Sequence, residues 1–169
     1  MLASMAEKPD PELTEAEAVL LMAVTREAMG DAGALGASLG QGPFRDPWSE
    51  RSGAAGGRFG ARFTRPRSAA AVVEVPHDPA AVREQATAAI AAGGVVIDDP
   101  NAAGDGSIWG VVRSGALDMA PALVRVQVDT TGAGGSRVRV RATGREGLIK
   151  QRIAAKAVDR LCEAVSRST

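Results

Sequence analysis

Apolar and polar residues alternate most regularly in two stretches of the second half of the chain. Residues 122–129 read Ala-Leu-Val-Arg-Val-Gln-Val-Asp, and residues 137–142 read Arg-Val-Arg-Val-Arg-Ala. A period of two sends successive side chains to opposite faces of a strand. The glycine-rich stretch 132–135 lies between them and supplies turn residues. The pattern predicts an antiparallel hairpin with one buried face and one charged face.

Shorter apolar runs predict three more strands, at residues 69–75, 95–98 and 107–113. Asp78 and Pro79 suit the N-cap and first position of a helix that follows the first of these strands. A pair of glycines, 93 and 94, ends this predicted helix.

A second helix is predicted at residues 148–165, where one side is apolar and the opposite side is charged. The resulting order is strand, helix, four strands, helix. It predicts an α+β fold, in which an antiparallel sheet of four or five strands carries two helices on one face and leaves the other face open to solvent.

This element order, over residues 69–166, resembles the helix-grip and TATA-box-binding-protein-like topologies. Members of that broad group include lipid-transfer and polyketide-cyclase-like domains and small bacterial envelope domains. The resemblance rests on element order and on no sequence motif, so it implies a fold and a candidate class of apolar ligands but no functional residues.

The N-terminal region predicts one further helix. Thr14 and Glu17 form a capping-box pattern, and the apolar run 18–24 follows. Gly30 and Gly33 are expected to end the helix. Because the run is apolar nearly all round, we expect this helix to pack on the rest of the chain; the alternative is a helix that docks a partner or a second copy.

Residues 32–67 are rich in glycine and arginine and show no sustained period, which is typical of a flexible tether. The chain therefore divides into an N-terminal helical segment (1–31), a tether (32–67) and an α+β body (68–169). Four of the five aromatic residues of the protein lie in the tether. Either these rings anchor the tether on the body, which we favour, or they form a recognition element. The candidate partner-docking residues are Val19, Leu20, Leu21, Met22, Phe44, Trp48, Phe59 and Phe63.

The formal net charge is zero, because 20 basic residues balance 20 acidic ones. The charge is unevenly distributed: residues 1–31 are acidic and residues 32–67 are basic. A neutral chain has no overall field that attracts nucleic acid or an anionic membrane, so nucleic acid is an unlikely partner. The longest apolar run, 18–24, has seven residues, whereas a membrane span needs about 20. The start of the chain lacks the pattern of a secretory signal, and we expect a cytoplasmic protein with the composition of a GC-rich bacterial genome.

The sequence offers little for catalysis or for metal binding. His77 and Cys162 are the only residues of their kinds, and nothing in their spacing pairs them as base and nucleophile. One histidine and one cysteine cannot form a zinc tetrad. Asp98, Asp99, Asn101 and Asp105 crowd one turn, but turn chemistry explains them without a cation. We therefore predict no catalytic residue, no metal and no cofactor.

Arginines form the most distinctive surface pattern. Arg137, Arg139 and Arg141 share one strand face, Arg125 is expected on the neighbouring strand, and Arg113 extends the set. Such a face either is an ordinary solvated one or binds anions such as nucleic acid or an acidic protein. Single-strand readers also need stacking rings, and Trp109 is the one aromatic residue of the body. The ordinary solvated face is the favoured interpretation.

An apolar loop, residues 116–121, is expected to lie over a groove between the last helix and the sheet. The candidate ligand-groove residues are Trp109, Leu117, Met119, Ala154 and Ala157. These patterns favour a non-catalytic binding or adaptor module that acts through protein contacts, with a protein partner or a second copy. The alternatives are a carrier of small apolar ligands or a cyclase-like domain, and a weak anion or nucleic-acid binder.

Overall fold

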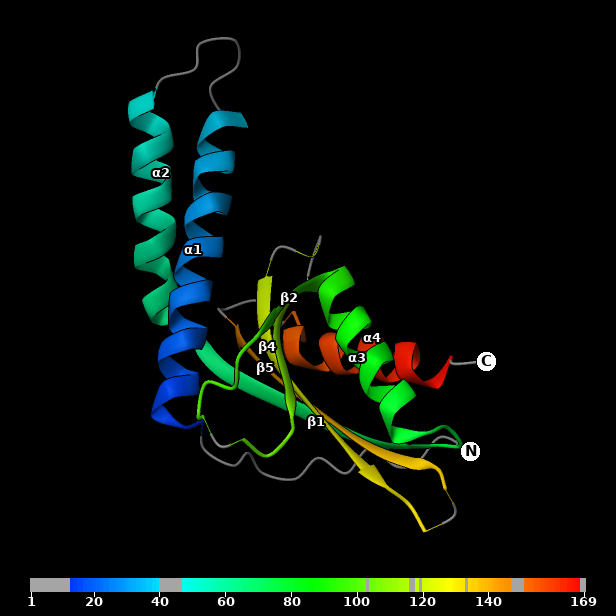
Figure 1. The fold of residues 1–169 in the computed structure, drawn as a ribbon. Coiled ribbons are helices and arrows are strands. Elements are labelled where there is room, and N and C mark those ends of the chain that lie inside the picture. Colours follow the sequence, from blue (N-terminus) through cyan, green and yellow to red (C-terminus); the bar gives the residue numbers. More distant parts are fainter. Residues whose placement is uncertain are drawn as a thin grey trace.

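The computed structural model describes residues 13–39, 47–102, 104–115, 118, 120–132, 134–146 and 151–167 (Figure 1). Two helices come first, and a sheet with two further helices follows. The elements are α1 (Glu15–Leu39), α2 (Pro47–Gly60), the short 3₁₀ helix η1 (Ala61–Phe63), β1 (Arg65–Val75), α3 (Pro79–Gly93), β2 (Gly94–Ile97), β3 (Ile108–Ser114), β4 (Ala120–Thr130), β5 (Ser136–Glu146) and α4 (Ile153–Ser166).

The sheet has five antiparallel strands in the order β1-β5-β4-β3-β2, which confirms the predicted α+β class. The alternating stretches of the sequence form β4 and β5, paired with Val126 opposite Val140. Strands β1 and β2 lie at opposite edges of the sheet, and α3 connects them. Asp78 caps α3 as predicted, because its carboxylate accepts the Ala80 N–H at 2.9 Å.

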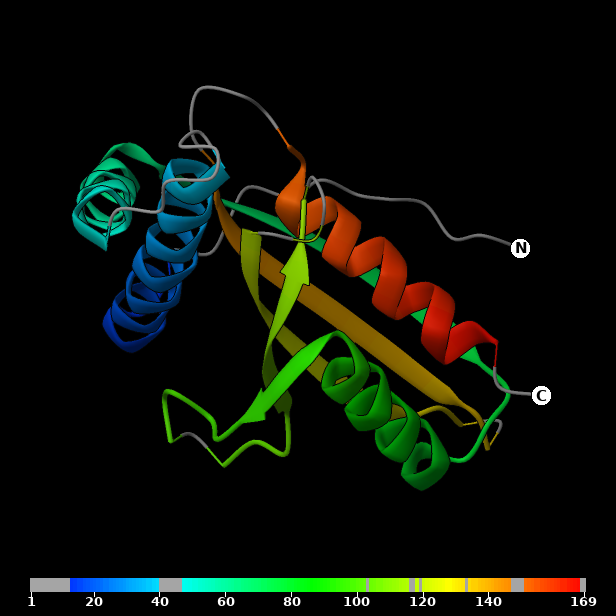
Figure 2. The same cartoon turned by 90° about the horizontal axis from the view of Figure 1, so that it is seen from above.

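Helices α3 and α4 cover the same face of the sheet (Figure 2). Glycine allows a close approach at two points, where a side chain would not fit. At Gly110 on β3, an added Cβ would overlap Ile90 of α3. At Gly144 on β5, an added Cβ would lie 2.5 Å from Cγ2 of Ile153 on α4. The layer between helices and sheet is thus packed with side chains from both sides.

Helix α1 covers part of the opposite face, which the sequence pattern left open to solvent. Leu21 is fully buried and packs with Trp109 of β3 and Leu123 of β4. The predicted capping box is present: the Thr14 N–H donates to the Glu17 carboxylate at 2.8 Å, and the Glu17 N–H donates to the Thr14 hydroxyl at 3.3 Å. The expectation that this helix packs on the body is therefore correct.

The predicted end of α1 at Gly30 and Gly33 is wrong, because the helix continues to Leu39. Gly30 is buried inside the helix, where the Arg58 side chain of α2 crosses it. At Gly57 of α2 an added Cβ would overlap the carbonyl of Met29. These glycines therefore permit close packing of two helices, and that packing outweighs their low helix propensity.

Regular structure also replaces much of the predicted tether. Residues 47–63 form α2 and η1, and β1 begins at Arg65 rather than at residue 69. The expected boundaries after residues 31 and 67 consequently fall inside α1 and inside β1. At the other end of the chain, α4 begins at Ile153 rather than at residue 148, after Arg152 in a left-handed conformation (φ 54°).

Candidate functional site

The predicted row of arginines lies on the face of the sheet that α1 partly covers. Arg137 and Arg139 point to this face from β5, and each forms an ion pair with an acidic neighbour. Glu74 Oε1 lies 2.7 Å from Arg137 Nη2, and Asp129 Oδ2 lies 3.1 Å from Arg139 Nη2. Exposed pairs of this kind contribute about 0–1 kcal/mol each. Their main effect is to cancel the positive charge of the row, which weakens its attraction for anions.

Arg125 and Arg141 lie directly opposite each other on β4 and β5. The buried carboxylate of Glu17, from α1, lines the same small space between them and the helix. Arg125 also forms an ion pair with Asp105 and stacks over the Trp109 ring, with 5.2 Å from its guanidinium carbon to the ring centroid. The arginines opposite α1 thus belong to the packing between helix and sheet.

Trp109 does share the face of the arginine row, but it is only 3% exposed. Leu21 of α1 and the guanidinium of Arg125 cover its ring. A buried ring cannot stack on a base, so Trp109 does not provide the aromatic platform that a single-strand reader needs. Arg113 lies on β3 and is exposed.

The predicted ligand-groove residues do not come together. Ala154 and Ala157 of α4 are buried against the face of the sheet opposite to the one that carries Trp109. Leu117 and Met119 lie outside the described residues. The sheet itself therefore separates the members of this predicted site that the structure describes.

The cysteine is poorly suited to nucleophilic chemistry. Cys162 is half-buried on α4, and burial, with a contribution from the carboxylate of Asp159, raises the pKa of its thiol to about 11. The thiol is consequently protonated at neutral pH, whereas the reactive species is the thiolate. His77 lies in the turn between β1 and α3, where its carbonyl accepts the hydroxyl of Ser136 at 2.7 Å.

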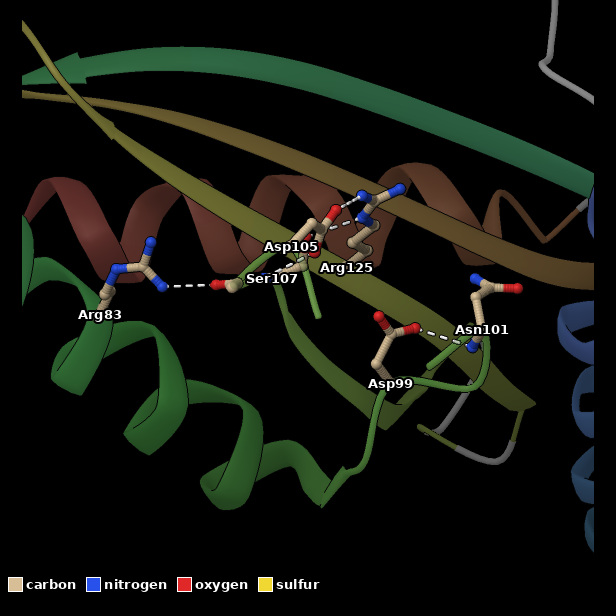
Figure 3. Close-up of polar contacts among 7 residues, drawn as sticks. Arg83, Asp99, Asn101, Asp105, Ser107 and Arg125 are labelled. Atoms are coloured by element: carbon tan, nitrogen blue, oxygen red, sulfur yellow. Dashed lines mark hydrogen bonds and ion pairs between the residues drawn. The ribbon is translucent and has the colours of Figure 1, made fainter. Parts of the chain in front are cut away.

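The acidic turn between β2 and β3 uses its side chains to hold its own shape (Figure 3). The Asp99 carboxylate accepts the Asn101 N–H at 2.8 Å. The Asp105 carboxylate accepts the Ser107 N–H at 2.9 Å and pairs with Arg125. Hydrogen bonds from Ser107, and then the charge of Arg125, hold the pKa of the Asp105 carboxyl below its usual value. Within the described residues there is no group of three metal-ligating side chains.

Two arginines attach this loop to the rest of the fold. Arg83 of α3 donates to the carbonyl of Gly106 (Figure 3). It also donates to the carbonyl of Val128 at 3.1 Å. Arg125 of β4 donates to the Ser107 hydroxyl at 3.0 Å. Both contacts join residues far apart in the chain, and no local pattern in the sequence indicates them. They fix the position of the loop relative to the sheet.

An open groove of about 920 Å³ runs between α1 and this loop. Its walls combine apolar side chains with acidic ones and are formed by Thr14, Glu15, Ala16, Val19, Leu20, Ala23, Ile97, Asp98, Pro100 and Asn101. The Thr14 hydroxyl bonds to the Asn101 side chain and joins the two walls at one end. Two exposed carboxylates, those of Glu15 and Asp98, therefore lie among the apolar side chains that line the groove.

The structure separates the predicted partner-docking residues into distinct groups. Leu21 is buried against the sheet, whereas Val19 is 65% exposed and lines the groove together with Leu20. Met22 is partly buried on α1. Phe59 and Phe63 are exposed at the end of α2 and in η1. Phe44 and the side chain of Trp48 lie outside the described part of the chain.

No protein-family model matches the chain, and no curated protein matches its sequence. In the part of the chain that the structure describes, no helix is both long enough and apolar enough to cross a membrane.

Proposed function

We propose that this protein is a non-catalytic protein-binding module, which takes up a peptide segment of a partner in the groove between α1 and the β2–β3 loop. The observation that carries the proposal is the exposure of Val19. Leu21, two residues further along the same helix, is fully buried. Exposed apolar side chains that gather in a groove are typical of protein-interaction sites.

The chemistry of the groove specifies the segment that would bind. Its apolar side chains call for apolar side chains on the partner, and the carboxylates of Glu15 and Asp98 call for lysine or arginine beside them. One further exposed valine, Val95, extends the apolar surface along the edge strand β2, because it lies opposite Val111 on the face that carries Trp109. The expected partner segment is therefore both apolar and basic.

The groove is also held in its open shape before any partner arrives. The Asn101 N–H bond to the Asp99 carboxylate and the Thr14–Asn101 side-chain bond hold the loop wall, and the packing of Leu21 on Trp109 holds α1. A preformed site loses little conformational entropy on binding, which favours affinity.

The alternative functions receive less support. A carrier of apolar ligands needs room between helices and sheet, but Gly110 and Gly144 bring the helices into direct contact with the strands. Binding of anions at the arginine row meets the opposing carboxylates of Glu74 and Asp129.

Selection from a random-peptide phage library tests the proposal. The immobilised full chain is the bait, and a Val19→Asp variant is used for counter-selection. We expect enriched peptides that carry apolar residues together with lysine or arginine. Synthetic copies should bind Val19→Asp at least about tenfold more weakly, since a buried unpaired carboxylate costs over 1.4 kcal/mol.

The matched control is Val72→Asp, which places the same charge at an exposed valine of β1, at the other edge of the sheet. This variant should bind the peptides as tightly as the unchanged chain. Failure to enrich any peptide would contradict the proposal. So would peptides that are acidic, or peptides whose affinity falls equally in both variants.

A further inference from the structure

A second exposed surface lies where α2 ends and β1 begins. It consists of two phenylalanine rings and two arginines at helical spacing and is called the Phe–Arg surface below. Its members are Arg58, Phe59, Arg62 and Phe63. Arg65 and Arg67 follow on β1, but they point to the α4 side of the sheet, because they lie opposite Glu146 and Gly144. Phe59 is 57% exposed and Phe63 is 73% exposed.

The two rings form a small aromatic platform on this surface. Their centroids lie 5.5 Å apart, with an angle of 67° between the ring planes. The guanidinium carbon of Arg62 lies 5.5 Å from the centroid of Phe59. The rings thus contact each other and a cation, while much of their area stays in contact with solvent.

The arginines of this surface differ from those elsewhere in the fold. Arg125, Arg137, Arg139, Arg160 and Arg167 each form an ion pair. Within the described residues no carboxylate lies within ion-pair distance of Arg58 or Arg62. The sequence carries no acidic residue from position 51 to position 73. Among the residues that the structure describes, the charges of Arg58 and Arg62 are therefore not cancelled by an ion pair.

The backbone beneath the rings is fixed by buried contacts. Thr64 is buried, and its hydroxyl donates to the carbonyl of Ala61 at 2.7 Å. Arg145 of β5 donates to that same hydroxyl at 3.0 Å and to the Thr64 carbonyl. The turn from η1 into β1 is thereby tied to the sheet, and the surface is organised in advance of any ligand.

We propose that the Phe–Arg surface binds single-stranded nucleic acid. Exposed rings stack on bases, and unpaired arginines contact the phosphate groups between them. Arginine rather than lysine supplies all of the charge, and its planar guanidinium also stacks on bases and bonds phosphate with two N–H groups. The surface lacks an apolar groove, which an acidic amphipathic helix would need; the residues between the rings are Gly60, Ala61 and Arg62.

Fluorescence anisotropy of the full chain tests this proposal. The probe is a fluorescein-labelled oligo-dT of about 15 nucleotides, close to the largest site size of one single-strand-binding domain. A duplex of the same length and a labelled poly-glutamate peptide serve as comparison ligands. We expect oligo-dT to bind more tightly than either of them.

Salt should weaken this binding strongly. Each phosphate contact to a single strand contributes about −0.7 to the slope of log K against log salt, so that two arginine contacts predict a slope of about −1.4. Arg62→Glu should weaken binding and flatten this slope. Lys156→Glu, which makes the same charge change on the exposed side of α4, should leave binding unchanged.

The phenylalanines distinguish base stacking from mere attraction between charges. Phe59→Ala and Phe63→Ala should each weaken oligo-dT binding by about tenfold, because stacking is worth about 1–3 kcal/mol per base. Val72→Ala, at an exposed apolar side chain outside the surface, should have no effect. All three side chains are exposed, so the thermal unfolding of these variants should match that of the unchanged chain.

Three results would overturn the proposal. One is no detectable binding of oligo-dT at about 25 mM salt, where electrostatic screening is weak. Another is that poly-glutamate binds as tightly as oligo-dT and that both phenylalanine variants bind poly-glutamate with unchanged affinity. This result would indicate a general site for acidic chains. The last is an equal loss of binding in Lys156→Glu and in Arg62→Glu.

Discussion

The side chain that is missing at Gly144 decides how closely α4 can approach the sheet. With no Cβ at this position, Ile153 fits against the backbone of β5. Gly144→Ala would place a methyl group 2.5 Å from Cγ2 of Ile153. Overpacking of this kind costs about 1–3 kcal/mol, and we expect a decrease of that size in the free energy of unfolding, measured by urea denaturation.

Gly132→Ala provides the control for that substitution. Gly132 lies in the β4–β5 turn, and a Cβ there would meet no atom within 4 Å. The free energy of unfolding should change by less than about 0.5 kcal/mol, which is usual for surface positions. Equal effects at both glycines would show that conformational freedom, rather than the contact with Ile153, governs Gly144.

Cys162 gives a residue-scale prediction about reactivity. Burial raises the pKa of its thiol to about 11, from a usual value of 9.0. At pH 8 the folded chain therefore holds far less thiolate than the unfolded chain, although a more basic thiolate is also more nucleophilic. The two effects combine to a labelling rate at least about tenfold slower in the native state than in urea. Labelling with a disulfide reagent, followed spectroscopically, measures this; equal rates would contradict it.

The same pKa shift predicts how stability changes in alkali. The folded state holds the Cys162 proton more tightly than the unfolded state does. This contribution is complete below pH 9 and is lost as the pH rises from about 9 towards 11. Cys162→Ser should remove this part of the decline in the free energy of unfolding, and an unchanged alkaline decline in the variant would contradict the assignment.

At the scale of elements, two neighbouring glycines of α2 should respond in opposite ways. A Cβ at Gly57 would overlap the carbonyl of Met29 on α1, whereas a Cβ at Gly56 would meet nothing within 4 Å. Gly56→Ala should stabilise α2 by about 0.5–1 kcal/mol through helix propensity alone. Gly57→Ala should destabilise the pair of helices, because α1 and α2 must move apart.

Limited proteolysis of the α1–α2 region measures this difference directly. Cleavage should be faster than in the unchanged chain for Gly57→Ala, and slower or unchanged for Gly56→Ala. If both substitutions slow cleavage to the same extent, then the close contact between Gly57 and Met29 is not a determinant of this packing.

The docking of α1 on the sheet depends on Leu21, which is fully buried beside Trp109. Leu21→Ala should cost about 2–5 kcal/mol. In a Trp48→Phe background the emission comes from Trp109 alone, and it should shift to longer wavelength as α1 loosens and water reaches the ring. Val19→Ala, at the exposed neighbouring position, should leave the emission maximum in place. An unshifted spectrum in Leu21→Ala would contradict the proposed role of Leu21.

Elements defined by local chemistry could be predicted from the sequence, and those defined by long-range packing could not. The β4–β5 pairing follows from alternation, and the cap at Asp78 follows from its own turn. Helix α2 has a glycine-rich sequence that disfavours an isolated helix, and its packing along α1 compensates. The extension of α1 beyond Gly30 has the same cause.

The candidate sites divide in a similar way. Phe59 and Phe63 could be singled out from the sequence, because they are large apolar residues in a segment where no core was expected. The exposure of Val19 could not be predicted, because the whole apolar run 18–24 was expected to be buried. The roles of Arg83 and Arg125 could not, because each contacts a loop more than fifteen residues away in the chain. The burial of Trp109 could not be predicted either, because the residues of α1 that cover its ring are far from it in the sequence.

At the scale of the whole molecule, the two proposed surfaces belong to opposite edges of the sheet. The groove borders β2, and the Phe–Arg surface borders the start of β1. Their charges are also opposite, acidic in the groove and basic at the phenylalanines. We therefore expect the selected peptide and oligo-dT to bind at the same time. Titration of the peptide into a preformed complex should leave the anisotropy of labelled oligo-dT high, and displacement would show that the two surfaces overlap.

The pairing of β1 with β5 has a consequence for biosynthesis. Val75 pairs with Ser136, and Arg65 pairs with Glu146, so the first strand meets its partner only after most of the chain has been made. While the ribosome translates the intervening residues, the alanine- and valine-rich segment 69–73 of the nascent chain has no strand beside it. Completion of the sheet is thus a late step of synthesis, and a chain interrupted before residue 136 would expose an unpaired, aggregation-prone strand to the translation machinery and its chaperones.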